Sequence, residues 1–359
     1  MIVLIEVNWR LQACQVFILM KKRNVNDSVL LSVTPGSFEL SFCKKTFKIE
    51  PVQVALKPQT LSGFIAERNN YSFRVNIITK KDFRSSENKA VCYNPKLIKL
   101  KATDIACANC GCVVCSNVSF KRILPLPSEG CDLSDFFCHN HGNELNSAQD
   151  KLRNISREDC LYGSYYFKIN SDYLKGIKCG VVYCRRCLEW LGTKCDESVK
   201  LWNCSVNFSD SEMEEKKEPW LDFYNTVLLI ANTCVRPLCK VIVRCQITDY
   251  STQYLLLWVM DKNLNVLLYK VSSSSSSCLL EMKVAKVLYV FLEEETALFQ
   301  EWQNDPCTEN IEVSKQMFTD GILSLRLSSR IIPESSNKTN DMHIGYLGIP
   351  IDLLKLENL

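Results

Sequence analysis

The sequence predicts a β-rich α+β protein, and three observations lead to this prediction. Short apolar runs rich in β-branched and aromatic residues recur along the chain between polar, turn-forming clusters, which is typical of antiparallel strands. Beside some of these runs, apolar residues follow helical spacing instead. Twelve of the 20 cysteines gather between residues 96 and 205. We therefore expect a β-sandwich-like domain over residues 1–95, a zinc-stapled Cys-rich region over 96–205 and an α+β domain over 206–359.

Residues 1–95 are expected to form a small antiparallel sandwich or open barrel. Between Tyr71 and Ile78, apolar side chains alternate with Arg74 and Asn76, as in a strand with one buried face. This part holds three of the 20 cysteines and no histidine, which favours a scaffold over a catalytic domain. The other expected strands here are Ile2–Val7, Gln15–Met20, Val29–Val33, Ser37–Phe42, Phe47–Ile49 and Gly63–Ala66.

Two C-x2-C pairs in the middle part predict a metal site formed by Cys107, Cys110, Cys184 and Cys187. This spacing lets two thiolates reach one ion from a single tight turn, and Gly111 suits the backbone under the first pair. Four sulfur ligands are typical of a closed, tetrahedral, structural zinc site. Because 73 residues separate Cys110 from Cys184, the ion would join two distant segments and remove much entropy from the unfolded polypeptide.

Two alternatives to this ligand set stay open. Cys112 and Cys115 have the same spacing directly after the first pair, so a shifted ligand set or a second ion also fits the pattern. Gly111 favours Cys107 and Cys110 over that shifted pair. The four cysteines would otherwise pack as small, reduced apolar side chains without a metal.

The middle part also contains an extended connector and a loop with metal-binding side chains. Leu124–Glu129 reads Leu-Pro-Leu-Pro-Ser-Glu, which predicts a rigid connector of polyproline character. Asp135–Gly142 reads Asp-Phe-Phe-Cys-His-Asn-His-Gly and places Cys138 and His139 on one loop. The plainer interpretation is a surface loop held by its two phenylalanines.

In the C-terminal part, Pro219 begins a predicted helix, at a position where proline is well tolerated. A second helix is expected over Glu294–Gln303, whereas Ser272–Ser277 predicts a flexible loop and Arg330–Asp341 a polar, mobile segment. Apolar residues recur at helical spacing and form one face of the first helix at Trp220, Phe223, Val227 and Ile230. The expected strands are Lys240–Ile247, Tyr254–Met260, Asn265–Tyr269, Lys286–Leu292 and Gly345–Ile351.

Composition excludes several classes of function. The net charge is only +3 with both signs well mixed, so we expect no electrostatic field for nucleic acid or a membrane surface. No run of 18 apolar residues and no signal peptide is visible. We therefore expect a cytosolic or nuclear protein, in which the many cysteines stay reduced. Common hydrolase and nucleotide-binding motifs are absent, and four thiolates leave no open position on a catalytic metal. The residues alone thus predict a zinc-stapled interaction protein, in which one of the other cysteines could still act as a nucleophile.

The order of several motifs carries a more specific signal. They are Cys107–Gly111, Arg122–Glu129, Phe137–His139, Asp159–Phe167, Tyr183–Cys187, Tyr254–Val259 and Lys286–Tyr289. These motifs run from about residue 105 to 290 and include little of the N-terminal part. In this order they resemble the HECT-like, ubiquitin-conjugating-enzyme-binding family of ubiquitin ligases, some of whose members are known as cyclin-B-binding.

The resemblance implies a ligase that accepts ubiquitin from a conjugating enzyme and passes it to a lysine of a substrate or of the ligase itself. The conjugating enzyme is expected to dock in the C-terminal half, where the matching stretch is Glu218–Lys240. The helical face that begins at Trp220 would then offer aromatic anchors to a groove of the enzyme. The alternative is that this face packs on the following strands of the same polypeptide.

A second role implied by the resemblance is inhibition of the zinc-dependent endonuclease of messenger-RNA 3′-end processing. The matching segment is Arg122–Phe167, and a rigid connector could present Cys138 or His139 to the endonuclease zinc and displace its water. In this sequence, Asn140 and His141 follow His139, so the loop departs in detail from the family pattern.

The sequence also departs from a true HECT ligase at the acceptor cysteine, which such ligases carry near the C-terminus. The last cysteine here is Cys307, and its context, Asn304–Thr308, is acidic and would not lower its pKa. Cys307 is thus only a weak candidate for a catalytic residue. Scaffolded transfer, in which the protein orients the loaded enzyme beside the substrate, fits the sequence at least as well.

Overall fold

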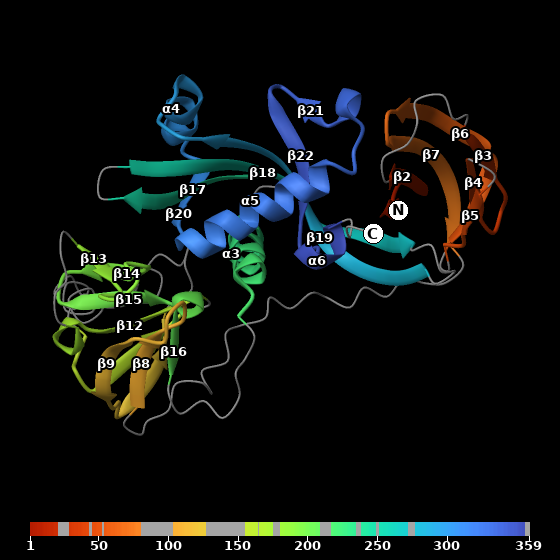
Figure 1. Ribbon diagram of the computed structural model, residues 1–359. Helices are drawn as coiled ribbons and strands as arrows, with labels where there is room; N and C mark the ends of the chain where they lie inside the picture. The colour runs from red at the N-terminus through yellow and green to blue at the C-terminus, as the bar shows by residue number, and fades with distance from the viewer. Residues whose placement is uncertain are drawn as a thin grey trace, which may run out of the picture.

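One curved, ten-stranded sheet holds strands from both ends of the protein (Figure 1). Its main path runs β21-β22-β19-β18-β1-β2-β7-β6, with β17 beside the first half of β18 and β20 beside β17. The strands are β1 (Ile2–Asn8), β2 (Ala13–Leu19), β6 (Val54–Glu67), β7 (Asn70–Thr79), β17 (Cys239–Thr248), β18 (Ser251–Val271), β19 (Ser277–Leu292), β20 (Thr308–Glu312), β21 (Lys338–Thr339) and β22 (Met342–Leu347). The computed structural model describes residues 1–20, 29–42, 45–51, 54–79, 103–126, 155–163, 165–174, 180–208, 217–234, 238–248, 251–271 and 277–355.

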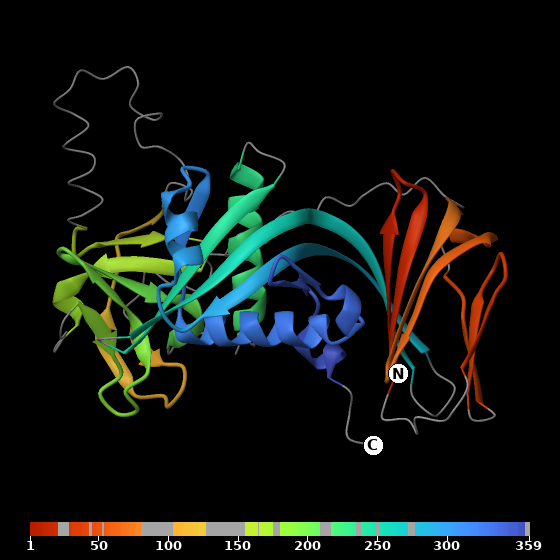
Figure 2. The ribbon, with the colours of Figure 1, turned by 90° about the horizontal axis from the view of Figure 1, so that it is seen from above.

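β18 and β19 connect the two ends of the molecule. The first half of β18 pairs with β17, whereas its second half pairs with β1, and the register shifts around Asp261. Such irregularities bend a strand and increase its twist. Figure 2 shows both strands arching from the C-terminal helices to the N-terminal strands. The two separate strands predicted for Tyr254–Met260 and Asn265–Tyr269 are therefore one continuous strand.

The N-terminal part has the predicted antiparallel β structure. A three-stranded sheet of β3 (Leu30–Val33), β4 (Phe38–Phe42) and β5 (Lys45–Ile49) packs against β1, β2 and β7. The two sheets enclose a core in which the rings of Phe38 and Phe73 meet edge to face, 5.4 Å apart. Phe73, Val75 and Ile77 are fully buried, as the alternation in the sequence indicates.

The Cys-rich middle is built from two small sheets around one core. The six-stranded sheet has the order β10-β11-β12-β15-β14-β13, and the three-stranded sheet the order β16-β8-β9. These strands are β8 (Thr103–Cys107), β9 (Val113–Val118), β10 (Arg122–Pro125), β11 (Asp159–Tyr162), β12 (Tyr166–Asn170), β13 (Val181–Tyr183), β14 (Trp190–Cys195), β15 (Ser198–Trp202) and β16 (Val206–Phe208).

The described residues of the C-terminal part form four α-helices: α3 (Pro219–Thr233), α4 (Ala297–Asn304), α5 (Lys315–Ser329) and α6 (Ile351–Leu354). In the described parts of the protein, none of the helices is long and apolar enough to cross a membrane. The helix from Pro219 and the one near residue 300 were expected, and they confirm the α+β prediction. α5 was not. Its N-cap is Ser314, whose hydroxyl accepts the Met317 N–H at 3.1 Å, and it packs across α3.

The predicted mobile segment Arg330–Asp341 is instead packed against the rest of the protein, so this prediction is wrong. Ile331 and Ile332 are buried in a core with β1 and β22 residues. The Asn70 side chain donates hydrogen bonds to the carbonyls of Arg330 and Ile332, at 2.7 and 3.1 Å. These contacts hold the segment across the turn that joins β6 and β7.

Candidate metal centre and partner surfaces

The first Cys-x2-Cys turn, here called knuckle 1 (Cys107–Gly111), lies between β8 and β9. The Cys107 carbonyl accepts the N–H of Gly111 at 2.9 Å, and the Cys107 N–H donates to the Cys112 carbonyl at 2.8 Å. Gly111 has φ +70°, a left-handed conformation that glycine adopts without strain. The backbone therefore wraps around the two sulfurs as the sequence predicts.

The second turn, knuckle 2 (Cys184–Leu188), lies between β13 and β14 and repeats this backbone pattern. The Leu188 N–H donates to the Cys184 carbonyl at 2.9 Å, and the Cys184 N–H donates to the Glu189 carbonyl at 2.9 Å. Leu188 takes the left-handed position, with φ +60°, and is 72% exposed. A side chain in this conformation costs about 1–2 kcal/mol. The second knuckle was thus predicted from its cysteines, but no glycine marks the strained position.

The two knuckles bring their four sulfurs together in one cluster. All four Sγ atoms lie within 4.8 Å of one another; Cys107 Sγ is 3.6 Å from Cys187 Sγ, and Cys110 Sγ is 3.5 Å from Cys184 Sγ. A tetrahedral zinc ion with Zn–S bonds of about 2.3 Å holds its sulfurs about 3.8 Å apart. The donor set and its spacing therefore fit zinc, which would tie the two small sheets of the middle part to each other.

The other C-x2-C pair does not join this cluster. Cys112 Sγ lies 3.7 Å from the Val113 carbonyl, and Cys115 is buried in the apolar core of the middle part. Burial raises the pKa of Cys115 to about 12, so its thiol stays protonated at neutral pH. Within the described ranges, Cys107, Cys110, Cys184 and Cys187 are the group that could hold a metal. The structure thus favours the predicted set over the shifted one.

Electrostatics in the cluster differ from thiol to thiol. Burial raises the pKa of Cys107 to about 12, whereas the backbone N–H of Glu189 and neighbouring groups lower the pKa of Cys187 to about 7. The Arg186 guanidinium donates to the Cys110 carbonyl at 3.3 Å and places a positive charge beside the sulfurs. Zinc binding would require all four thiolates and would release the remaining protons.

The predicted docking face of α3 is mostly buried. Phe223 and Val227 are fully buried and Ile230 is 5% exposed, in a core shared with α5 and the large sheet. Gly321 of α5 makes this packing close, because a Cβ at that position would lie 2.6 Å from the Phe223 ring. These three side chains therefore pack within the protein, as the alternative interpretation of the helical face predicts, and are not free to dock on a partner. Trp220 is half-buried at the start of the helix.

The candidate endonuclease-binding side chains, Cys138 and His139, lie outside the described residues. The structure describes only the two ends of the segment Arg122–Phe167. These are residues 122–126, 155–163 and 165–167. β10 and β11 are parallel neighbours in register, with Arg122 opposite Asp159. The two ends of the segment therefore lie side by side.

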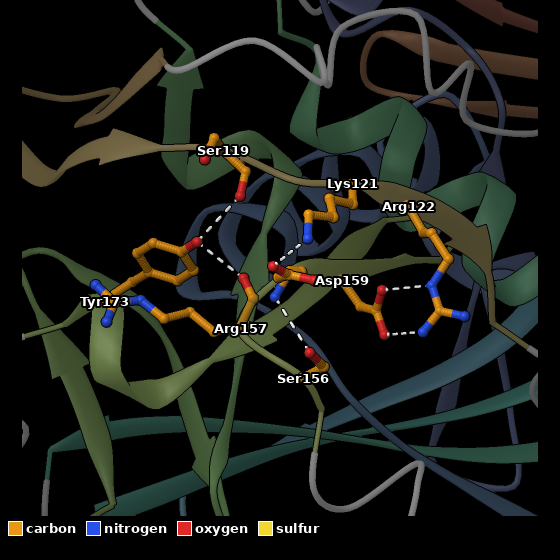
Figure 3. Close-up of polar contacts among 8 residues, drawn as sticks. Ser119, Lys121, Arg122, Ser156, Arg157, Asp159 and Tyr173 are labelled. Atoms are coloured by element: carbon orange, nitrogen blue, oxygen red, sulfur yellow. Dashed lines mark hydrogen bonds and ion pairs between the residues drawn. The ribbon is translucent and has the colours of Figure 1, made fainter.

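Polar contacts fasten these two ends (Figure 3). The Arg122 guanidinium donates to both Asp159 oxygens, at 2.8 and 2.6 Å, a bidentate pair with fixed geometry. The Tyr173 hydroxyl donates to the carbonyls of Ser119 and Arg157, at 3.1 and 2.8 Å. Strand pairing and side chains together therefore fix both ends of the segment.

The weak catalytic candidate Cys307 lies before β20 and is half-buried. Its N–H donates to Asp305 Oδ1 at 2.9 Å, and Lys240 Nζ donates to the same carboxylate at 2.9 Å. The Lys240 ammonium is the main cause that lowers the pKa of Asp305. The acidic neighbour expected from the sequence is thus neutralised by a lysine, and Cys307 stays a prediction.

Sequence reasoning missed one charged cluster. Glu6, Lys286 and Tyr346 meet on the inner face of the large sheet although they are up to 340 residues apart. Glu6 is the one charged residue in the otherwise mostly apolar strand β1, which is the only signal the sequence carries for this cluster.

Comparison with known proteins gives a consistent picture. A family model described as HECT-like ubiquitin-conjugating enzyme (E2)-binding matches residues 6–344. A Rattus norvegicus protein named as an E3 ubiquitin-protein ligase is 26% identical over 287 residues, which cover 77% of this protein and 74% of the relative. The Mus musculus protein of the same name is 23% identical over 343 residues, 88% of this protein and 90% of the relative. The Pongo abelii protein is 21% identical over 397 residues, 97% and 98% of the two sequences. No solved structure matches.

Proposed function

The chain belongs to the HECT-like, ubiquitin-conjugating-enzyme-binding family, and we propose that it is a ubiquitin-protein ligase. It binds a loaded conjugating enzyme and promotes ubiquitin transfer to lysines of substrate proteins and of itself, in the cytoplasm and nucleus. The observation that carries the proposal is the family match over residues 6–344. The names of the rat, mouse and Pongo abelii relatives support it.

Transfer is scaffolded rather than covalent. A thioester acceptor needs an accessible cysteine with thiolate character. Burial raises the pKa of six described cysteines, Cys14, Cys115, Cys160, Cys204, Cys239 and Cys245. The four clustered cysteines are occupied as metal ligands. Among the described cysteines, this leaves half-buried Cys112, Cys234 and Cys307, of which Cys307 is the acceptor candidate.

The conjugating enzyme docks at the start of α3. Phe223 and Val227 hold α3 on α5, so a partner that used them would have to unfold the core. Trp220 and Leu221 are half-buried in the first turn and can be contacted without that cost. Partly exposed aromatic residues are frequent anchors of protein interfaces. The zinc centre has a structural role in this proposal.

The direct test follows the discharge of ubiquitin from a panel of loaded conjugating enzymes on non-reducing gels. Faster discharge onto lysine without an adduct on this protein is the expected result. A reducible adduct that disappears in Cys307→Ser, but persists in the matched Cys234→Ser variant, would replace scaffolded transfer by a covalent mechanism. No acceleration with any enzyme would overturn the ligase proposal.

A second candidate function is inhibition of the zinc-dependent endonuclease of messenger-RNA 3′-end processing through Arg122–Phe167. The bidentate Arg122–Asp159 pair is consistent with it, because it holds the two described ends of this segment side by side on the middle part of the protein. Inhibition should be lost in Cys138→Ala/His139→Ala with zinc content unchanged. Undiminished inhibition by that variant would sink the idea. A cyclin-B-type substrate is proposed on the resemblance alone.

A further inference from the structure

A hollow lies on the concave face of the large sheet, between the N-terminal strands and β22. It has a volume of about 500 Å³ and adjoins a smaller hollow of about 340 Å³. Both are lined by Glu6, Asn8, Lys286 and Ile344, so the Glu6–Lys286 pair lies where they meet. Volumes of this size are typical of ligand sites.

The centre of the hollow is a buried carboxylate. Glu6 is 9% exposed, and its Oε1 atom accepts hydrogen bonds from Lys286 Nζ, at 2.8 Å, and from the buried Tyr346 hydroxyl. The second oxygen, Oε2, has no hydrogen-bond partner among the described residues. Buried ion pairs add little stability compared with apolar packing of the same volume. Their presence beside a hollow therefore points to binding rather than to folding.

The larger hollow carries one positive charge in excess. Glu6 is balanced by Lys286, and Arg74 of β7 lines the same wall with its side chain exposed. No hydrogen bond or ion pair joins the Arg74 side chain to another described residue. In the smaller hollow, Asp261 adds a negative charge. The two adjoining hollows, here called the trough, thus run from a cationic end at Arg74 to an acidic end at Asp261. This arrangement suits an extended ligand with a carboxylate at one end.

Polar side chains from three neighbouring strands line part of the larger hollow, and apolar side chains line the rest. Gln15, Ser62 and Ser72 line the larger hollow and offer amide and hydroxyl groups at the spacing of neighbouring strands. The segment that carries Ile332 closes the far side, where Asn70 ties it to the turn between β6 and β7. Amide and hydroxyl groups on neighbouring strands can hydrogen-bond the backbone of an extended polypeptide.

We propose that this trough binds an extended substrate polypeptide through a carboxylate, which Arg74 receives at the cationic end. The carboxylate comes either from the C-terminus of the polypeptide or from an aspartate or glutamate side chain. The inference rests on the proposed ligase function only in calling the bound polypeptide a substrate.

The test is a selection from random decapeptides displayed with free C-termini, on the immobilised full-length protein and on Arg74→Ala. Selected peptides are then synthesised as free acids and as C-terminal amides, and Kd is measured by fluorescence polarisation. We expect carboxylate-bearing peptides that bind Arg74→Ala at least tenfold more weakly than the wild type. Loss of binding on amidation identifies the peptide's C-terminal carboxylate as the bound group, and retention identifies a side-chain carboxylate.

The matched control is Arg10→Ala, which removes an exposed arginine in the turn between β1 and β2, outside the lining of the trough. Its affinity should equal that of the wild type. A second variant, Glu6→Gln/Lys286→Met, replaces the buried ion pair without leaving a lone charge and should also weaken binding; circular dichroism checks its fold. The proposal is overturned if no peptide is enriched, or if Arg74→Ala binds the selected peptides as tightly as the wild type. Because peptide binding needs no conjugating enzyme, failure here and failure of the discharge assay are separate results.

Discussion

Replacement of one knuckle cysteine should release the metal and destabilise the middle part of the protein. Cys184 is fully buried, and its sulfur lies 3.5 Å from that of Cys110. Structural zinc contributes about 10–16 kcal/mol through four thiolates, or about 3–4 kcal/mol for each ligand. Closing a loop between segments 73 residues apart is worth about 4 kcal/mol by the loop-closure entropy relation, which is of the same order. The contribution of one ligand, about 3–4 kcal/mol, and that of loop closure, about 4 kcal/mol, are each a substantial fraction of a net stability of about 5–15 kcal/mol.

We therefore expect Cys184→Ser to lose its zinc, measured by elemental analysis, and to lose about 3–4 kcal/mol in urea unfolding of the zinc-loaded protein. Cys112→Ser is the matched control, because this half-buried cysteine follows knuckle 1 but lies outside the sulfur cluster. Its zinc content should equal that of the wild type. Retention of zinc and stability in Cys184→Ser, or loss of zinc in Cys112→Ser, would refute the ligand assignment.

Four further substitutions test the packing and the electrostatics of the helices. Gly321→Ala places a Cβ 2.6 Å from the buried Phe223 ring and should lower the unfolding free energy by about 1–2 kcal/mol in urea, and a variant as stable as the wild type would contradict this packing. Trp220→Ala should weaken conjugating-enzyme binding, measured by calorimetry, with little loss of stability. Phe223→Ala should instead lower the unfolding free energy by about 3–5 kcal/mol. Unchanged binding in Trp220→Ala would remove the docking assignment. Burial raises the pKa of Asp222 to about 6, above its unfolded value, so this group lowers stability as pH rises from about 4 to 6. Asp222→Asn should therefore be about 1–2 kcal/mol more stable than the wild type at pH 7.5 and lose that advantage near pH 4. If the variant and the wild type are equally stable at both pH values, Asp222 is not buried in this way.

Local signals in the sequence were sufficient where a few neighbouring residues determine the structure. The cluster of four cysteines was predictable because each knuckle is a short turn that needs only its two cysteines, and Gly111 marks the left-handed position of the first. The N-terminal strands were predictable because alternation such as that around Phe73 reports one buried face. In both cases, the physical cause lies within a few residues of the feature.

Features that depend on distant partners could not be predicted in this way. α5 has a Gly and buried serines on its inner face, so its apolar periodicity is weak, and its position depends on contact with Phe223. Ile331 and Ile332 are buried in a core with β1 and β22, and Asn70, about 260 residues away in the sequence, donates to the carbonyls of Arg330 and Ile332. The Glu6–Lys286 pair joins strands from opposite ends of the protein, and an acidic residue within an apolar strand is its only local signature.

The part of the protein that carries the candidate metal centre shares a buried core with α3, which affects how the function can be tested. Tyr165 and Trp202 of the middle part share one buried core with Phe223 and Val227 of α3. Removal of zinc would loosen the sheets that carry Tyr165 and Trp202, and this disturbance would reach the face that holds α3 in place. Loss of ligase activity after chelation would therefore not show that zinc takes part in transfer. Trp220→Ala separates the two effects, because it alters a half-buried contact at the start of the helix while leaving the metal and the shared core intact.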